Sequence, residues 1–226
     1  MTLLTTAFAQ GTHAARPAAS ASNNGFYYYE TDTTNLFQST GSAWQQIAST
    51  GGGGGGAVTQ LSISTLAAPA ANFDISAISS AYNHLELWLL LRGTKAATVT
   101  NVRVRLNADS AANYDQQELF GGGGTAGADA SAGQTFAFMG NANAASATAG
   151  SFSFLRLVIP FYKGTTAHKV FTAYGGTFIT EGTTTSYASV VETGLWRSTA
   201  AVTEITVFPD ANNWDTGSAY VLYGVN

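Results

Sequence analysis

The sequence predicts an all-β protein, built as a sandwich or a barrel. Three observations lead to this prediction: apolar and polar residues alternate in several short segments, Gly and Asn clusters separate these segments, and almost no stretch has a helical pattern. Alternation with a period of two is typical of a half-buried strand. Many short strands between turn signals, without helices between them, indicate a sandwich or a barrel. The one helix that we expect is a turn or two within residues 75–82.

The N-terminal region is predicted to have three parts: an anchor arm over residues 1–12, an aromatic β-hairpin collar over residues 13–50, and a polyglycine linker over residues 51–57. A short hairpin buries too little apolar surface to be stable alone in water. Six consecutive glycines make a flexible connection with an average reach of roughly 13 Å, which argues against rigid docking of the collar on the rest of the chain. The collar is therefore expected to pack against other copies of the chain.

Aromatic residues on both faces of one strand support this expectation. Tyr27, Tyr28 and Tyr29 are adjacent, so in a strand they point alternately to opposite faces. The alternative, a collar that packs on the chain's own sandwich, needs only one apolar face. Arg16 is expected to anchor the entry to the hairpin by pairing with Glu30 or Asp32. The residues expected to serve oligomerisation and attachment are Arg16, Tyr27, Tyr28, Tyr29, Phe37 and Trp44.

Residues 58–226 carry the strands of the main domain. Residues 102–106 alternate between apolar and polar side chains, as a half-buried strand does. Residues 85–91 are apolar almost throughout, which predicts a strand covered on both faces. Residues 152–159 change phase midway, which predicts either a β-bulge or an interior Arg156. Further strands are expected at residues 169–174, 186–191, 205–207 and 219–223.

The composition excludes several classes of function. Only 10% of the residues are charged, against about a quarter in typical proteins, and the formal net charge is −4. Such a surface packs against neighbours without desolvating many ions, and it has no electrostatic footprint for nucleic acid or an anionic membrane. The absence of cysteine excludes disulfides, thiolate catalysis and thiolate metal sites. Residues 1–10 lack the basic region of a signal peptide, and no apolar run approaches the length of a membrane span.

Parts of the sequence resemble virion proteins of tailed bacteriophages. Residues 11–48, GTHAARPAASASNNGFYYYETDTTNLFQSTGSAWQQIA, resemble the collar hairpin of phage fibre, spike and decoration proteins, in which "RPA", "YYETDT" and "LFxSxGSAW" recur in this order. The C-terminal part resembles a β-sandwich of phage appendages in LNADSAANYD (106–115), ETGLWRSTAAVTEITV (192–207) and VLYGV (221–225). The resemblance covers most of the chain outside residues 1–10 and the glycine run. It implies an eight-stranded jelly roll over residues 58–226 and assembly as a homotrimer.

The pattern of polar residues does not indicate an enzyme. His13, His84 and His168 lie in unrelated contexts, none at the spacing of metal ligands, and the chain has no G-x-S-x-G nucleophile elbow. Residues 51–56 match G-x-G-x-x-G, but a dinucleotide site needs a strand before the motif and a helix after it. A strand-like segment follows here instead. We therefore expect no catalytic residue, no cofactor and no metal.

Acidic residues suggest two weaker alternatives. Glycoside cleavage requires two carboxyl groups that converge across a cleft, and nothing in the spacing of Glu181 with Glu192, or of Asp115 with Glu118, shows such convergence. The loop that begins at Asp109 offers oxygen ligands of the kind that calcium prefers, without EF-hand spacing. An Asx-rich turn, whose side chains bond to their own backbone, explains this loop more simply.

Glycan binding without catalysis is the main alternative function. A sugar site combines an aromatic face with polar side chains, and four aromatic residues are candidates for exposure: Trp196, Trp214, Tyr114 and Tyr162. Trp196 also suits packing at a sandwich edge or a subunit interface. The residues that we select as candidate glycan contacts are Trp214, Asp215, Tyr114 and Asp115.

Together, these observations predict a non-enzymatic structural protein of a phage virion, synthesised in the host cytoplasm. It is expected to form a homotrimer and to attach through its N-terminal region to a capsid or tail protein. The alternative is a tail-fibre protein that recognises host surface glycans through its C-terminal sandwich. Neither function requires nucleic acid or membrane insertion.

Overall fold

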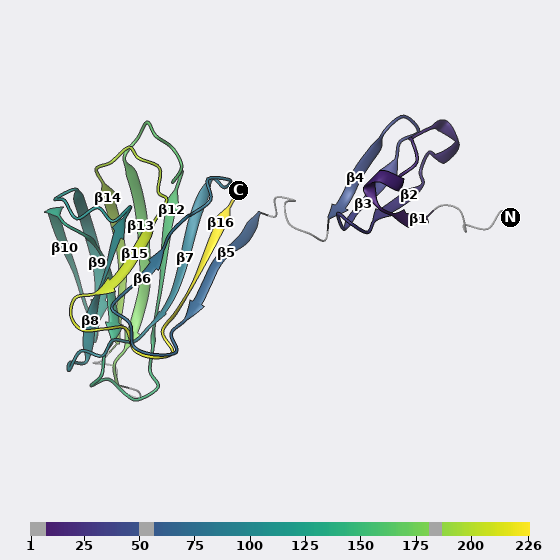
Figure 1. The fold of residues 1–226 in the computed structure, drawn as a ribbon. Coiled ribbons are helices and arrows are strands. Elements are labelled where there is room, and N and C mark those ends of the chain that lie inside the picture. Colours follow the sequence, from purple (N-terminus) through teal and green to yellow (C-terminus); the bar gives the residue numbers. More distant parts are fainter. Residues whose placement is uncertain (1–7, 50–56, 181–186) are drawn as a thin grey trace. The chain divides into compact units, whose positions relative to one another are not determined.

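The computed structural model describes residues 8–49, 57–180 and 187–226. The chain divides into two compact units, Met1–Gly56 and Ala57–Asn226, which we call the small unit and the large unit (Figure 1). The predicted polyglycine linker lies outside the described residues except for Ala57. No helix in the described ranges is long and apolar enough to cross a membrane.

The small unit contains a four-stranded sheet with the order β1-β2-β3-β4. Strands β2 (Tyr27–Glu30), β3 (Asn35–Ser39) and β4 (Trp44–Ser49) form an antiparallel meander, and β1 (Phe8–Gly11) pairs in parallel with β2. The small unit is therefore larger than the predicted single hairpin. Phe8–Gly11, which were predicted to belong to an N-terminal arm, form strand β1 of this sheet instead. A parallel pair needs a connection of a dozen or more residues. The segment from β1 to β2 supplies it, with short 3-10 turns at His13–Ala15 and Ala21–Asn23.

The large unit is an antiparallel β-sandwich, which confirms the predicted fold class. One sheet has the order β10-β9-β14-β13-β12-β7-β16-β5, and the other has the order β11-β8-β15-β6. The strands are β5 (Val58–Thr65), β6 (Phe73–Ile75), β7 (His84–Leu91), β8 (Val99–Leu106), β9 (Tyr114–Gly122), β10 (Thr125–Gln134), β11 (Ala137–Asn143), β12 (Ser153–Pro160), β13 (Lys169–Phe178), β14 (Tyr187–Trp196), β15 (Ile205–Pro209) and β16 (Ala219–Val225). The expected helical turn within residues 75–82 is absent from this described segment, which runs from the end of β6 through bends and turns.

The strand order is consistent with jelly-roll winding, extended by two hairpins. Without the hairpins β9–β10 and β13–β14, every connection from β5 to β16 crosses from one sheet to the other except the one from β8 to β11, which are neighbours in the smaller sheet. The remaining strands then form two four-stranded sheets, β5-β16-β7-β12 and β6-β15-β8-β11, as in a double Greek key. Both hairpins join the same sheet, so the expected count of eight strands is too low and one sheet is twice as wide as the other.

Strict alternation along the strands builds the core between the two sheets. On β7, Leu85, Leu87, Leu89 and Leu91 are buried, whereas Trp88 is 42% exposed. The prediction that this strand is covered on both faces is wrong, because the outer face of the large sheet has no covering layer among the described residues of this unit.

Strand β12 follows the same rule. Ser153, Leu155, Leu157 and Ile159 point inward, and the pairing of β12 with both neighbouring strands has no register shift. Both alternatives for this segment are therefore wrong: β12 contains no bulge, and Arg156 lies on the outer face. The apparent change of phase in the sequence arises because outward positions on β12 are also apolar.

Candidate functional site

Arg16 organises the small unit. Its Nη1 lies 3.0 Å from Oε1 of Glu30, which confirms one of the two predicted pairings. The guanidinium also lies 4.1 Å from the ring centroid of Phe37 and 5.9 Å from that of Trp44. Asp32, the other predicted partner, instead accepts a hydrogen bond from the backbone N–H of His13 at 2.8 Å.

The Glu30 carboxylate is buried and fully partnered. Besides Arg16, it contacts His13 Nδ1 at 2.7 Å and accepts a short hydrogen bond from the Thr33 hydroxyl. Burial by itself raises the pKa of Glu30, but the hydrogen bonds from Thr33 and His13 and the charges of His13 and Arg16 outweigh it and hold the pKa below its usual value. The ionised carboxylate therefore ties the N-terminal segment to the end of β2.

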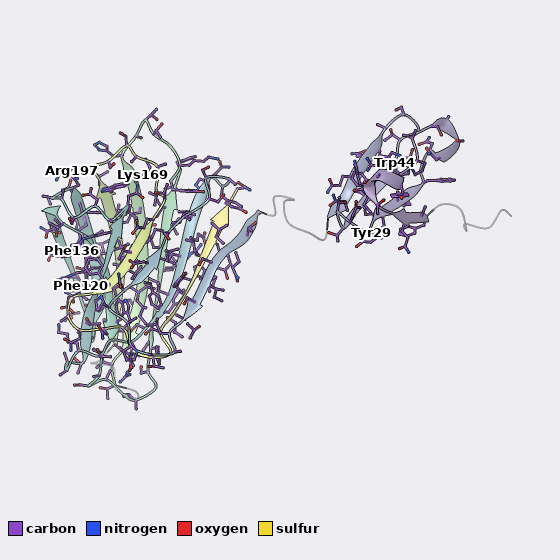
Figure 2. All side chains as sticks on the ribbon, viewed as in Figure 1. Tyr29, Trp44, Phe120, Phe136, Lys169 and Arg197 are labelled. Carbon is purple, nitrogen blue, oxygen red and sulfur yellow. The ribbon has the colours of Figure 1, made fainter. Side chains whose placement is uncertain are left out.

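The three adjacent tyrosines alternate between faces, as expected. Tyr28 is buried, with its ring edge-on to Trp44 at 6.0 Å, whereas Tyr27 is exposed and Tyr29 is half-buried. Trp44 donates a hydrogen bond from Nε1 to the Pro17 carbonyl at 2.7 Å. Figure 2 labels Tyr29 and Trp44 on the small unit. Tyr28 is the only fully buried apolar side chain in the described part of this unit, so its core is very small.

The aromatic residues selected for glycan contact are not exposed. Trp214 and Tyr114 are completely buried, and Trp196 and Tyr162 are nearly so. The Trp214 indole donates a hydrogen bond to the Val207 carbonyl at 3.1 Å. Its backbone bridges to Ala70 and Gly93, so the loop that carries it closes over the core. The prediction of Trp214 and Tyr114 as glycan contacts is therefore wrong.

Tyr114 instead has a structural role at the start of β9. Its hydroxyl accepts a hydrogen bond from the backbone N–H of Leu106 at 2.9 Å. Burial raises the pKa of this phenol to about 12. The selected carboxylates also take part in local structure: Asp115 lies 3.4 Å from Arg197 Nε, and Asp215 lies 3.8 Å from Arg92 Nε.

The loop that begins at Asp109 is an Asx-type turn. The Asp109 carboxylate accepts hydrogen bonds from the backbone N–H of Ala111, from Asn113 Nδ2 and from Trp196 Nε1, at 2.9, 2.9 and 2.7 Å. Burial raises the pKa of Asp109, and these hydrogen bonds outweigh it, so that the net shift is downward. Within the described ranges, no group of three acidic or histidine side chains is placed to hold a metal ion.

Three acidic residues face one another across strands of the large sheet. Glu192 on β14 is paired with Glu118 on β9, and Glu118 is paired with Asp129 on β10. Glu192 is completely buried, and neither of its carboxylate oxygens has a hydrogen-bond partner. Burial, together with the charges of Glu118 and Asp129, raises the pKa of Glu192 to about 8. Glu181, considered above as its catalytic partner, lies outside the described residues.

A pocket beside Glu118 has no counterpart among the sites predicted from the sequence. It has a volume of about 340 Å³ and lies where the large sheet passes the edge strand β11 of the small sheet. Its lining includes Phe120 and Glu118 from β9, Phe138 and Asn141 from β11, and Thr177 from β13. No spacing in the sequence indicates this pocket, because its walls come from five strands of two sheets.

An apolar row on the outer face of the large sheet is a second feature that the sequence did not predict. Cross-strand pairing aligns one outward residue from each of the eight strands, in the order Ala128, Leu119, Val191, Tyr174, Arg156, Trp88, Val221 and Ile63. Its exposed large apolar members are Leu119, Val191, Tyr174, Trp88 and Ile63, each 37% to 58% exposed. The one charged member, Arg156, is neutralised by Glu86 at 2.5 Å and lies 5.6 Å from the Trp88 ring. The row is thus a wide, nearly uncharged apolar surface.

Comparison with protein-family models, with curated protein sequences and with solved structures finds no match to this chain.

Proposed function

We propose that this chain is a structural protein of a bacteriophage virion, a fibre- or decoration-type appendage. It forms a homotrimer and attaches to a capsid or tail protein through its small unit. Its role is assembly, not catalysis. The sequence resemblance in residues 11–48 and in the C-terminal segments suggests this class, and the physical properties of the two units support it.

The observation that carries the proposal is the very small core of the small unit. In the described part of this unit, only Tyr28, Glu30 and Ser39 are buried, and Arg16 pairs with the buried Glu30. Folded units with so few buried side chains approach the lower size limit of independent domains, at which disulfides, metals or oligomerisation usually supply the missing stability. The protein has no cysteine, and the described residues hold no acidic or histidine cluster suited to a metal. Burial against other chains is the remaining source of stability, and Tyr27 and Ile47 are exposed apolar residues that a neighbour would cover.

The outer face of the large unit is a second surface suited to assembly. Large contiguous apolar patches on a soluble protein mark interaction sites. The apolar row crosses every strand of the sheet, and its single charge is already paired with Glu86. Packing against this face therefore requires little desolvation of ions.

The mass of the full-length protein in solution tests the trimer. We expect light scattering to give a concentration-independent mass near three times 23.4 kDa. The double variant Tyr27→Ser/Ile47→Ser should dissociate at higher concentrations than the wild type, because it removes exposed apolar surface from the small unit. The matched control is Gln45→Ser, which changes an exposed polar residue of β4.

A monomeric mass at all concentrations would contradict the trimer. Immunogold electron microscopy of purified phage particles tests the virion assignment separately. Gold particles at one fixed position on the head or the tail are expected, and particles without label would refute a virion role.

The runner-up function is recognition of host surface glycans by the large unit. The two aromatic residues first selected for it, Trp214 and Tyr114, are buried, so this function needs another site. The pocket beside Glu118 is the observation that favours it.

A further inference from the structure

Two arginines on the outer face of the small sheet differ from the others because they have no counter-ion. Arg103 and Arg105 occupy outward positions two residues apart on β8, which alternates strictly between half-buried and buried residues. No carboxylate of the described chain lies within 4.0 Å of either guanidinium. The other arginines all form an ion pair with a carboxylate: Arg16, Arg92, Arg156 and Arg197.

Two phenyl rings hold these guanidinium groups in place. The Cζ atom of Arg103 lies 4.2 Å from the ring centroid of Phe136, and that of Arg105 lies 4.8 Å from the ring centroid of Phe208. The two rings lie edge-on to each other, with their centroids 6.2 Å apart. Figure 2 labels Phe136 on the large unit. A guanidinium that stacks on an aromatic face keeps its charge and its in-plane donors, so both groups are oriented but not neutralised.

The terminal Nη atoms of both arginines remain free to bind a ligand. Nε of Arg103 is buried, and Nε of Arg105 donates a hydrogen bond to the Thr135 carbonyl at 3.0 Å. In the described part of the chain, no hydrogen bond uses the Nη atoms of either residue, and these atoms are not buried. Each guanidinium therefore presents to solvent the paired donors with which arginine binds a carboxylate or a phosphate.

The carboxylate on a neighbouring strand of this sheet, Asp74, is too distant to neutralise the pair. Arg105 is aligned with Thr206 on β15, and Thr206 is aligned with Asp74 on β6. Asp74 is thus two strands away, at about 9–10 Å, and it already accepts a hydrogen bond from Asn72 at 2.7 Å. The two guanidiniums repel each other across one sheet face, and an anion bound over them would remove this repulsion.

The spacing of the pair favours an extended polypeptide as the ligand. Residues two apart on a strand are separated by about 7 Å and point to the same face, and an extended partner segment has the same repeat. Carboxylates at alternate positions of such a segment would therefore meet both guanidiniums. The methylene groups of these acidic side chains would pack over the half-buried rings of Phe136 and Phe208.

The charges of the molecule argue against a polyanion as the ligand. Arg103 and Arg105 are the only cations on β6, β8, β11 and β15, the strands of the small sheet, and the formal net charge of the chain is −4. Nucleic acid requires an extended basic surface, because its affinity comes from neutralising several phosphates. Two arginines are sufficient for two carboxylates.

We propose that the outer face of the small sheet binds an extended acidic segment of another protein, in which two carboxylates at alternate positions pair with Arg103 and Arg105. This face lies on the opposite side of the sandwich from the apolar row. The inference does not rest on the proposed virion function, because binding of an acidic peptide is measurable whether the chain is a monomer or a trimer.

NMR of the arginine Nε–Hε signals of the full-length protein tests the site. The probe is a capped peptide of serine and threonine that contains two glutamates separated by one residue. It should shift the signals of Arg103 and Arg105 with a millimolar dissociation constant and leave that of Arg197 unchanged, because Arg197 already pairs with Asp115. A second peptide of the same composition has its two glutamates adjacent, so that they point to opposite faces. It should bind about two- to fivefold more weakly, as the loss of one exposed ion pair predicts.

The variant Arg103→Gln should weaken binding of the first peptide by a similar factor of about two to five, measured on the Arg105 signal. The matched control is Lys163→Gln, which removes the same charge at an exposed position outside the small sheet and should leave the dissociation constant unchanged. Thermal melting of each variant shows whether the fold is retained. The comparison of the two peptides on the wild-type protein does not depend on any variant.

Inorganic phosphate and a single-stranded oligothymidylate are the competing anions in the same measurement. The proposal is overturned if neither peptide shifts the signals of Arg103 and Arg105, or if the two peptides bind equally well. It is also overturned if phosphate or the oligonucleotide binds and the peptide with alternate glutamates does not, or if Lys163→Gln weakens binding as much as Arg103→Gln.

Discussion

At the scale of single residues, two buried glutamates show how the environment decides the state of a carboxyl group. Glu30 is 1% exposed and is surrounded by Arg16, His13 and Thr33, so its pKa is lowered although burial opposes this. Glu192 is also buried, but it faces Glu118 and has no hydrogen-bond partner, so its pKa is raised. Glu30 therefore stabilises the fold as an anion, whereas Glu192 is accommodated in the core as a neutral acid.

The raised pKa of Glu192 therefore predicts that the folded protein loses stability as the pH rises. Its pKa lies near 8 in the folded protein, against an ordinary value of 4.5. Below the ordinary value both states are protonated and the group has no effect. Between the two values the folded state holds a proton that the unfolded state has released, so stability falls with increasing pH until the folded group also ionises.

The variant Glu192→Gln should remove this dependence. It should raise the melting temperature by at least about 4 °C at pH 8, with little change at pH 4. The measurement is thermal unfolding across this pH range. Asp74→Asn, at an exposed position on β6, is the control and should leave the slope unchanged. An equal effect of Glu192→Gln at both pH values would contradict the raised pKa.

At the scale of strands, side chains alternate strictly between the inner and the outer face of each sheet. Residues paired across neighbouring strands are complementary in size. Phe171 on β13 is buried, and its cross-strand partner on β14 is Gly194. A Cβ atom at Gly194 would lie 2.2 Å from the Phe171 ring. The ring thus fills the space that a side chain on β14 would occupy, and the absence of a side chain at this position is a packing requirement.

Gly194→Ala is expected to destabilise the large unit by about 1–3 kcal/mol, because the Phe171 ring must move within a close-packed core. Urea unfolding of the full-length protein measures the change. Thr193→Ala, at the neighbouring outward position, is the matched control and should have a much smaller effect. If Gly194→Ala left the free energy of unfolding unchanged, the core at β13 would be able to rearrange freely.

At the scale of the whole molecule, the two units differ in the source of their stability. The large unit has a continuous core of residues from both sheets, including Leu87, Val104, Phe171 and Trp214. The small unit has one buried tyrosine and a network around Glu30 in its described part. The first meets the conditions for folding alone, whereas under the proposed function the second is stabilised by partners.

Deletion of residues 1–56 should therefore leave a cooperatively folding large unit. Its melting temperature is expected to lie within a few degrees of the main transition of the full-length protein, and its mass by light scattering should be that of a monomer. A broad, non-cooperative transition would show that the large unit needs the small one. A trimeric mass would show that the large unit forms the trimer without the small unit, and the outer face of the large sheet would then be the expected trimer interface.

The sequence by itself determined the all-β class and limited the partner of Arg16 to Glu30 or Asp32, of which the structure shows Glu30. Both depend on local information: the period of two within strands, and a charge pair separated by a short segment of chain. It also predicted correctly that the adjacent tyrosines of β2 alternate between faces.

Only the tertiary structure decided which apolar residues are covered. Trp214 lies in a loop, yet it is buried, because that loop closes over the core next to Ala70 and Gly93. Trp88 lies in an apolar strand, yet it is exposed, because the second sheet covers only one face of the first. The two inserted hairpins widen one sheet alone, so they lengthen the apolar row on its outer face, and the pocket beside Glu118 lies where the wide sheet passes the edge of the narrow one. Such features depend on contacts between distant segments, which a local pattern does not encode.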